Sequence, residues 1–167
     1  MKIETAASGK AFLSGEYMAL DGGRAIILST PQSAKVLISE TNHTNNILVS
    51  SMSDHGYPFL VNEKLEIVWL EENPNQLGSI LSEGISQFNK GFSGKSIAID
   101  TSDFFYGERK IGIGSSAAVS AALTKALNKL LDLRLSSKAM IDYSRQIHNR
   151  SQDSHGSGFD VIASFLK

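Results

Sequence analysis

The pattern of apolar residues changes its period near residue 110, and this change constrains the fold more than any other feature of the chain. Before it, short apolar runs alternate with polar or glycine-containing breaks, which is typical of strands. These runs cover residues 11–13, 25–28, 36–38, 47–49 and 97–99. We expect a mostly antiparallel sheet, interrupted by one helix near residues 77–88, where apolar side chains recur at helical spacing.

After residue 110 the spacing becomes helical. An apolar stripe over residues 119–130 follows a start near Ser115 and predicts a helix that packs in the core. A second helix is expected to begin at Ser136 or Ser137 with serine as its N-cap. Residues 159–167 indicate the opening of a further apolar helix. Strands followed by helices predict one domain of the α+β class.

Composition argues against several classes of function. The 167 residues include 16 Lys and Arg against 17 Asp and Glu, so the chain lacks the cationic surplus that nucleic acids and anionic membranes attract. Without cysteine it offers no thiolate for catalysis or metal binding. No apolar run approaches the roughly 20 residues of a membrane span, and MKIETAASGK does not resemble a secretion signal. We expect a cytoplasmic protein.

A glycine-serine loop stands immediately before the first predicted helix of this second half. In KIGIGSSAAV, Lys110 is followed by Gly112, Gly114, Ser115 and Ser116. Such a loop predicts anion binding, because glycine lets the backbone approach a phosphate and the first N–H groups of a helix favour negative charge. Lys110 adds a full positive charge, and the serine hydroxyls can donate to phosphate oxygens or bind Mg²⁺.

The same loop is compatible with other interpretations than phosphate binding. The spacing Gly112-x-Gly114-x-x-Ala117 also matches the dinucleotide-binding fingerprint, but the residues before it are polar where a buried strand is required. Asp132 lies about 20 residues later, yet in or just after the predicted helix instead of at a strand end. The loop also lacks the Walker GK[ST] sequence. A glycine-rich helix start that binds nothing stays open.

Three segments together resemble the motifs of the GHMP kinases, the family of galactokinase, homoserine kinase, mevalonate kinase and phosphomevalonate kinase. The loop resembles the family's GLGSSAA-like phosphate loop, with Ile113 in place of leucine. SGKAFLSGEY at residues 8–17 resembles the first motif, and GSGFDV at residues 156–161 resembles the third. The resemblance implies the family's N-terminal ATP-binding domain over residues 1–167, with a ribosomal protein S5 domain 2-like fold, and a C-terminal domain that is absent from this chain.

Within this family, further sequence features resemble the phosphomevalonate kinases. They are Lys110 and the stretch of residues 148–160, whereas mevalonate kinases tend to have a metal-binding glutamate where Asn149 stands. Asp153 and Ser154 depart from the pattern, which often has glycine and lysine there. The resemblance implies an ATP- and Mg²⁺-dependent kinase of the mevalonate pathway, in isoprenoid biosynthesis, that phosphorylates phosphomevalonate. Mevalonate or another GHMP acceptor stays open.

The resemblance also implies a role for each motif residue. Asp160 would orient, and is able to deprotonate, the attacking oxygen of the acceptor, and Lys10 would neutralise charge between Asp160 and the transferred phosphoryl group. The expected substrate contacts are Lys10, Glu16, Ser157 and Gly158. The expected ATP-binding residues are Lys110, Gly112, Ile113, Gly114, Ser115, Ser116 and Ala117, with Ser115 as metal ligand.

Two further expectations concern the rest of the chain. His148 and His155 fit no standard zinc spacing, and we interpret them as helix-surface side chains without a metal. Without a C-terminal half the domain is expected to expose apolar surface and to self-associate. The alternative to a kinase is therefore a nucleotide-binding module or fragment with negligible phosphoryl transfer by itself.

Overall fold

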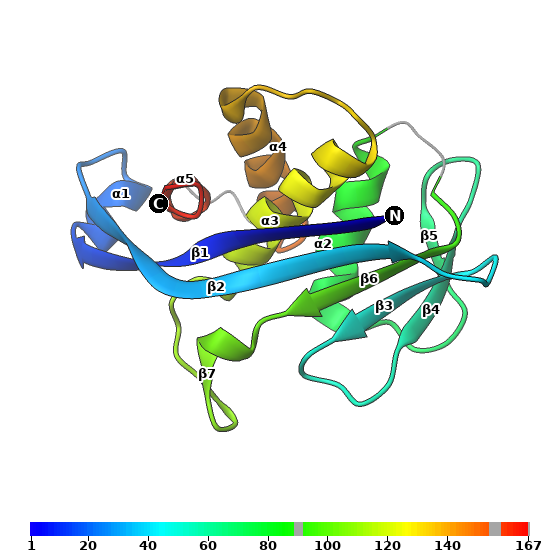
Figure 1. Cartoon of the computed structure of the whole chain (residues 1–167). Helices are drawn as coiled ribbons and strands as arrows, with labels where there is room; N and C mark the ends of the chain where they lie inside the picture. Colours follow the sequence, from blue (N-terminus) through cyan, green and yellow to red (C-terminus); the bar gives the residue numbers. More distant parts are fainter. Residues whose placement is uncertain (89–91, 154–157, 167) are drawn as a thin grey trace.

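The computed structural model describes residues 1–88, 92–153 and 158–166 (Figure 1). Strands come first along the chain and helices dominate after residue 110, as predicted. The strands are β1 (Lys2–Ser14), β2 (Ile26–Glu40), β3 (Asn46–Ser50), β4 (Tyr57–Val61), β5 (Ile67–Trp69), β6 (Lys95–Asp100), β7 (Phe105–Tyr106) and β8 (Arg109–Lys110). The helices are α1 (Glu16–Leu20), α2 (Asn75–Ser86), α3 (Ser115–Leu130), α4 (Ser137–Arg150) and α5 (Phe159–Ala163), with one 3-10 turn, η1 (Ser102–Phe104).

Six of the strands form one sheet in the order β1-β2-β6-β3-β4-β5. Neighbouring strands are antiparallel except β3 and β6, which are parallel, and this confirms the mostly antiparallel sheet. The apolar runs at residues 25–28 and 36–38 lie in the single strand β2. Between them the pairing with β1 shifts register opposite Gly9, and this irregularity accommodates Pro31, which has no N–H to give to a ladder.

The helices cover one face of the sheet, and the hydrophobic core lies between the two layers (Figure 1). Alternate residues of the central strands point into it, such as Val36 and Ile38 of β2 and Ile97 of β6. Helix α3 packs against β1, β2, α2 and α4, and it is buried on nearly all sides instead of along one stripe. Its many alanines and serines permit this, because small side chains let both layers approach the helix backbone.

The ends of the helices follow local signals in the sequence. Ser136 is the N-cap of α4, and its hydroxyl accepts a hydrogen bond from the Ala139 N–H at 3.2 Å. The helix predicted over residues 77–88 is α2, which begins and ends two residues earlier. Helix α5 is shorter than the apolar stretch that predicted it, because Phe165 and Leu166 donate to carbonyls three residues back and tighten the chain into turns.

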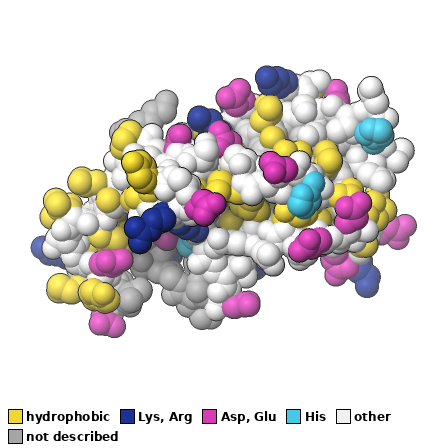
Figure 2. Space-filling model, turned by 90° about the horizontal axis from the view of Figure 1, so that it is seen from below, with side chains coloured by type: hydrophobic (Ala, Val, Ile, Leu, Met, Phe, Trp, Pro, Cys, Tyr) yellow, Lys and Arg dark blue, Asp and Glu magenta, His cyan; other side chains and the backbone are white. Residues whose placement is uncertain are grey.

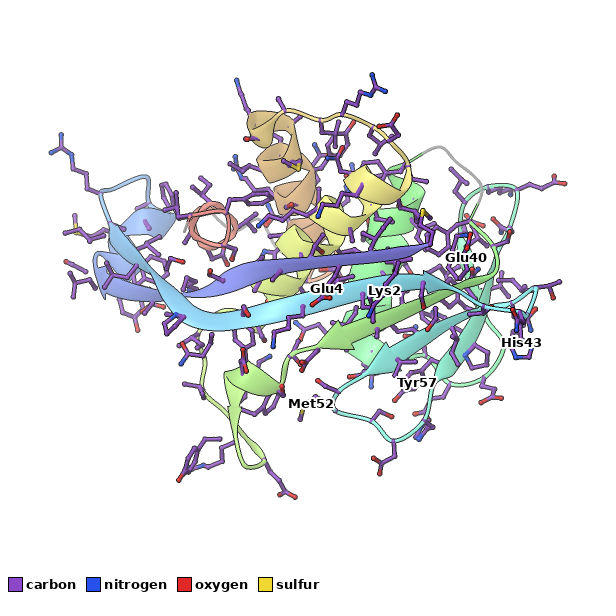
Figure 3. All side chains as sticks on the ribbon, in the orientation of Figure 1. Lys2, Glu4, Glu40, His43, Met52 and Tyr57 are labelled. Atoms are coloured by element: carbon purple, nitrogen blue, oxygen red, sulfur yellow. The ribbon has the colours of Figure 1, made fainter. Side chains whose placement is uncertain are left out.

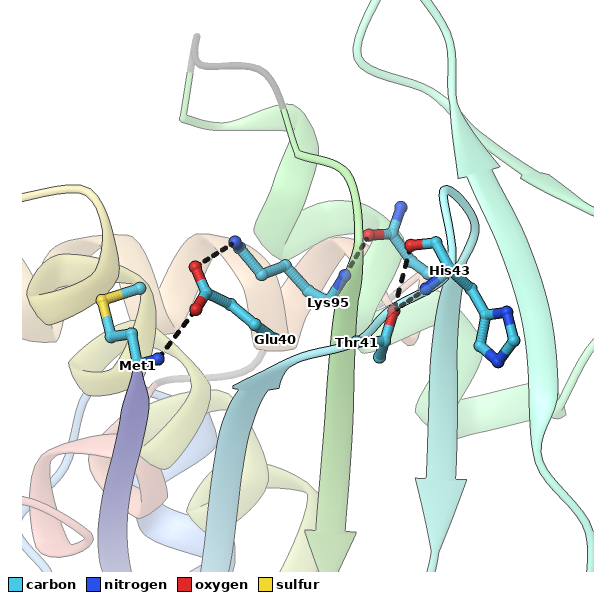
Figure 4. A network of polar contacts seen from close by, with 6 residues as sticks. Met1, Glu40, Thr41, His43 and Lys95 are labelled. Atoms are coloured by element: carbon cyan, nitrogen blue, oxygen red, sulfur yellow. Dashed lines mark hydrogen bonds and ion pairs between the residues drawn. The ribbon is translucent and has the colours of Figure 1, made fainter.

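A polar network joins three strands at the end of the sheet where the chain begins (Figure 4). Glu40 of β2 contacts the N-terminal ammonium of Met1 at 2.8 Å and Lys95 Nζ of β6 at 3.5 Å. The ammonium first, and Lys95 second, hold the pKa of the Glu40 carboxyl below its usual value. Because Glu40 and the N-terminal ammonium are about half exposed, their ion pair adds little to the stability of the sheet.

The outer edge of β1 is partly occupied by lysines from α3. Lys125 Nζ donates to the Ala6 carbonyl at 3.0 Å, and Lys129 Nζ donates to the carbonyl of Glu4 at 3.4 Å (Figure 3 labels Glu4). Lysines along an edge strand disfavour pairing with a strand of another chain, since any incoming strand must displace charged groups.

Exposed apolar side chains gather at the end of the molecule formed by α1 and the adjoining ends of β1 and β2 (Figure 2). Leu13, Tyr17, Met18, Ile26 and Leu28 are each at least half exposed. The predicted self-association of such a surface stays a prediction. Among the described residues, no helix is both long enough and apolar enough to span a membrane.

Candidate active site

The glycine-serine loop leaves the hairpin β7–β8 and enters α3. Gly112 has a φ of 82° and Gly114 a φ of 78°, in the left-handed region that favours glycine. Gly114 is the N-cap of α3 and offers no side chain to the first N–H groups of that helix, which stay available to an anion. The strand before the loop, β8, is short, exposed and antiparallel, so the dinucleotide-binding interpretation is wrong.

The first sequence motif lies directly against this loop. The Lys10 N–H of β1 donates to the Ile113 carbonyl at 2.8 Å. A Cβ atom on Gly114 would come within 2.8 Å of Lys10 Cγ, and one on Gly9 would come within 2.8 Å of the Ile113 oxygen. The glycines therefore let β1 and the loop pack backbone to backbone, and two motifs that are a hundred residues apart become one surface.

A pocket of about 230 Å³ opens beside the loop. Lys110, Ser115 and Ser116 line it, together with an apolar wall that includes Leu77 of α2 and Met52. Met52 lies on the side of the sheet where β7 is found (Figure 3). Among the described residues Lys110 has no carboxylate partner. A free ammonium, two hydroxyls and an apolar wall suit a ligand that carries both phosphates and a flat ring.

The third motif reaches the loop from α5. Gly158 precedes this helix with a φ of 75°, and a side chain there would collide with Arg145 of α4, so glycine lets α5 start against α4. Asp160 follows in the first turn with its side chain 25% exposed. Its Oδ1 accepts from the Val161 N–H at 2.9 Å, and its Oδ2 lies 3.8 Å from His148 Nε2.

His148 was predicted to be a helix-surface side chain, and this prediction is wrong. The residue is 6% exposed in the last turn of α4. Its Nε2 atom lies 3.2 Å from Ser116 Oγ and 3.0 Å from Gln152 Nε2, besides its contact with Asp160. In the sequence, helical spacing places His148 on the same face of the helix as Ser144, but it does not tell that this face is the buried one. The imidazole connects the loop to the third motif.

The other residues predicted for the site lie on separate elements of the structure. Glu16 is exposed in the first turn of α1, and Ala117 is buried in α3. Lys10 Nζ lies 4.2 Å from the centre of the Phe12 ring. The expected role of Lys10 beside Asp160 and a transferred phosphoryl group stays a prediction. Ser157 and His155 lie outside the described residues.

Metal binding can be judged from the donor set. Within the part of the chain that the structure describes, no cluster of three or more His, Cys, Asp or Glu side chains could hold an ion. The Ser115 hydroxyl does line the pocket. Mg²⁺ takes one or two protein ligands together with substrate phosphates and water, so this single hydroxyl fits a metal that arrives with a nucleotide.

The likeness of this fold to solved structures is extensive. The Lin0012 protein from Listeria innocua superposes with a TM-score of 0.81 at 18% identity, over 98% of this chain and 46% of that one. Phosphomevalonate kinase from Streptococcus pneumoniae, in complex with phosphomevalonate and AMPPNP, superposes with a TM-score of 0.74 at 22% identity. The match covers 97% of this chain and 46% of that one. Mevalonate kinase from Methanococcus jannaschii superposes with a TM-score of 0.72 at 20% identity, over 97% of this chain and 51% of that one.

These identities support the fold alone, and the chain spans about half the length of the structures it matches. No curated protein sequence matches it. The family model of the GHMP kinases N terminal domain matches residues 81–167, which is just over half of the chain and includes both the loop and the third motif. The chain therefore belongs to the GHMP kinase family, with the α+β fold of that family's N-terminal domain.

Proposed function

We propose that the protein uses this domain to bind ATP with Mg²⁺ and transfers the γ-phosphoryl group to phosphomevalonate. The observation that carries the proposal is the convergence of the three motifs. Lys10 is bonded to Ile113 of the loop, and Ser116 of the loop contacts His148, which contacts Asp160. Phosphoryl transfer asks a protein mainly for positioning and charge neutralisation, and this arrangement of cations, hydroxyls, N–H groups and one carboxylate supplies both.

The nucleotide would lie across the loop and the pocket beside it. In this proposal Gly112, Ile113, Gly114 and Ala117 supply the backbone around the phosphates, and the N-terminal end of α3 attracts their charge. Lys110 and Ser116 add charge and a hydroxyl, and the apolar wall receives the base. Ser115 would hold Mg²⁺ together with the phosphates, and the ion would neutralise their charge during transfer.

The acceptor would lie between β1 and α5. Asp160 would orient the attacking oxygen, with Lys10, Glu16, Ser157 and Gly158 around the substrate. Phosphomevalonate already carries a phosphate, so the site must place cations near two phosphorylated molecules. The contact of Lys10 Nζ with Phe12 is worth only about 0.5–1 kcal/mol at a solvated site, so the ammonium can turn to a phosphate at little cost.

Two alternatives are tested with the same protein. Mevalonate is favoured as acceptor by the likeness to a mevalonate kinase, which is about as strong as the likeness to a phosphomevalonate kinase. Nucleotide binding without transfer is the other alternative, because the chain spans about half the length of the structures it matches.

A coupled assay with ATP, Mg²⁺ and either phosphomevalonate or mevalonate tests the proposal. We expect turnover with phosphomevalonate, and Asp160→Asn should lower it by about 10²–10⁴-fold, the usual range for a proton-handling side chain. Asp132→Asn is the matched control, since Asp132 is exposed and pairs only with Arg134 among the described residues. Turnover with mevalonate alone would refute the acceptor, and a full rate in Asp160→Asn would refute the mechanism.

A direct measurement of nucleotide binding tests the alternative of binding without transfer. Calorimetric titration with AMPPNP and Mg²⁺ should show binding that Lys110→Ala weakens, whereas titration with NAD should show none. Binding of AMPPNP without any turnover would refute transfer by this chain and favour a nucleotide-binding module.

A further inference from the structure

His148 is a buried titratable side chain for which neither the loop nor the third motif accounts. It faces three elements through one atom: Nε2 lies near Ser116 at the start of α3, near Gln152 just after α4, and near Asp160 in α5. The other ring nitrogen, Nδ1, is buried and has no hydrogen-bond partner among the described residues. All polar contacts of the ring therefore converge on one side.

The carboxylate of Asp160 determines which nitrogen carries the hydrogen. An unprotonated Nε2 would keep its lone pair near a carboxylate oxygen 3.8 Å away, and the two would repel each other. A protonated Nε2 is attracted to the same oxygen. Gln152 can adapt to this state, because a half-turn of its amide presents an oxygen in place of the nitrogen. We therefore assign the hydrogen to Nε2.

A hydrogen on Nε2 also determines the direction of the Ser116 hydroxyl. Serine has one hydrogen to donate and can accept two. If Ser116 Oγ accepts from Nε2, its own hydrogen must point elsewhere. Ser120 and Thr124 donate theirs to carbonyls four residues back in α3, but Ser116 stands in the first turn, where no such helical carbonyl exists. The free direction is the pocket that Ser116 lines.

We propose that His148 is a positioning residue that turns the Ser116 hydroxyl into a fixed donor for a nucleotide phosphate and holds the Asp160 carboxylate at the acceptor side. One imidazole thereby sets the separation between the two halves of the site. The inference rests on the proposed function for its catalytic meaning, whereas the state of the ring itself can be tested without any nucleotide.

Nitrogen-15 NMR of the histidine side chains in the free protein tests the ring. The His148 signals are assigned by their loss in His148→Gln, and His43, which lies in the exposed turn after β2, is the internal reference. We expect a hydrogen on Nε2 and a shift of that resonance in both Ser116→Ala and Asp160→Asn. An unprotonated Nε2, or a resonance that neither variant moves, would overturn the inference whatever the enzyme assay gives.

Steady-state kinetics of His148 variants test whether this residue positions the site for catalysis. His148→Phe keeps a ring but loses the donor, and we expect kcat to fall about 10–100-fold, the range seen when a supporting contact of a site is lost. His148→Gln keeps a donor and should recover most of the loss. Thermal unfolding of both variants separates positioning from simple destabilisation, and His43→Phe is the control.

A double-mutant cycle decides whether His148 acts through Ser116. If it does, Ser116→Ala should cost much less in the His148→Phe background than in the wild type, because the contact is already lost. Additive losses, or a full rate in His148→Phe, would overturn the inference while the proposed function stands. Absence of both AMPPNP binding and turnover in the wild type would instead overturn the proposed function, and the NMR result would still decide the state of the ring.

Discussion

Gly9→Ala tests whether the backbone contact between β1 and the loop positions the site. The Cβ atom of alanine would lie 2.7 Å from Thr30 Oγ1 and 2.8 Å from both the Ile113 oxygen and Phe104 Cε1. The threonine can rotate, but Phe104 is fully buried and the carbonyl of Ile113 belongs to the loop backbone. The new methyl group must therefore push β1 and the loop apart.

The magnitude follows from these contacts. Overpacking costs about 1–3 kcal/mol, and with two unyielding neighbours we take the upper end, about 3 kcal/mol. Alanine recovers about 0.4–1 kcal/mol, because it restricts the unfolded chain more than glycine does. The free energy of unfolding should therefore fall by about 2 kcal/mol. For a domain of this size each kcal/mol lowers the midpoint by about 2–4 °C, so we expect a Tm lower by about 4–8 °C.

Two measurements follow the change. Thermal unfolding by circular dichroism gives the loss of stability, and calorimetric titration with AMPPNP and Mg²⁺ gives the affinity. Since Ile113 accepts from Lys10 and precedes Gly114, we expect the affinity to fall by about tenfold, which is about 1.4 kcal/mol. Gly94→Ala is the control. Gly94 directly precedes β6 and has a φ of 62°, so alanine there should introduce backbone strain of about 1–2 kcal/mol away from the loop.

The control separates loop geometry from general loss of stability. Gly94→Ala should lower the Tm comparably and leave the AMPPNP affinity unchanged. A Gly9→Ala protein with wild-type Tm and affinity would refute the packing argument. Equal losses of affinity in the two variants would attribute the effect to stability and not to the position of the loop.

Three other predictions concern stability and association. Ser136→Ala removes the cap of α4 and should cost about 1 kcal/mol in thermal unfolding, whereas Ser137→Ala, inside the helix, should change little. The backbone N–H of Ser102, and then its hydroxyl, hold the pKa of Asp100 below its usual value. The stabilisation that these contacts give the folded protein is therefore present at neutral pH and lost as the pH falls below about 4. Urea titrations across that range should show that the free energy of unfolding of Asp100→Asn depends less on pH than that of the wild type. Sedimentation velocity should detect self-association that a Tyr17→Ser, Met18→Ser double variant reduces, and a monodisperse wild-type monomer at high concentration would contradict this.

Much of the fold is determined by local pattern in the sequence. The start of α4 is encoded by Ser136, which bonds a residue three positions later, and α3 by apolar residues three and four apart. The glycine-serine loop is equally local, because the positive φ angles of Gly112 and Gly114 are conformations that few other residues adopt. Interactions of this kind span a few residues, so their spacing alone predicts them.

The site itself was decided by tertiary structure. Its motifs could be named from the sequence, but the contacts between them could not: Lys10 bonds to Ile113 across a hundred residues, and Ser116 meets His148 across 32. Helical spacing says that a side chain lies on one face, and only the packing of α4 against α3 says that the face of His148 is buried. The contact of His148 with Asp160 is likewise tertiary, because the approach of α5 to α4 through Gly158, and not the distance along the chain, brings these two side chains together.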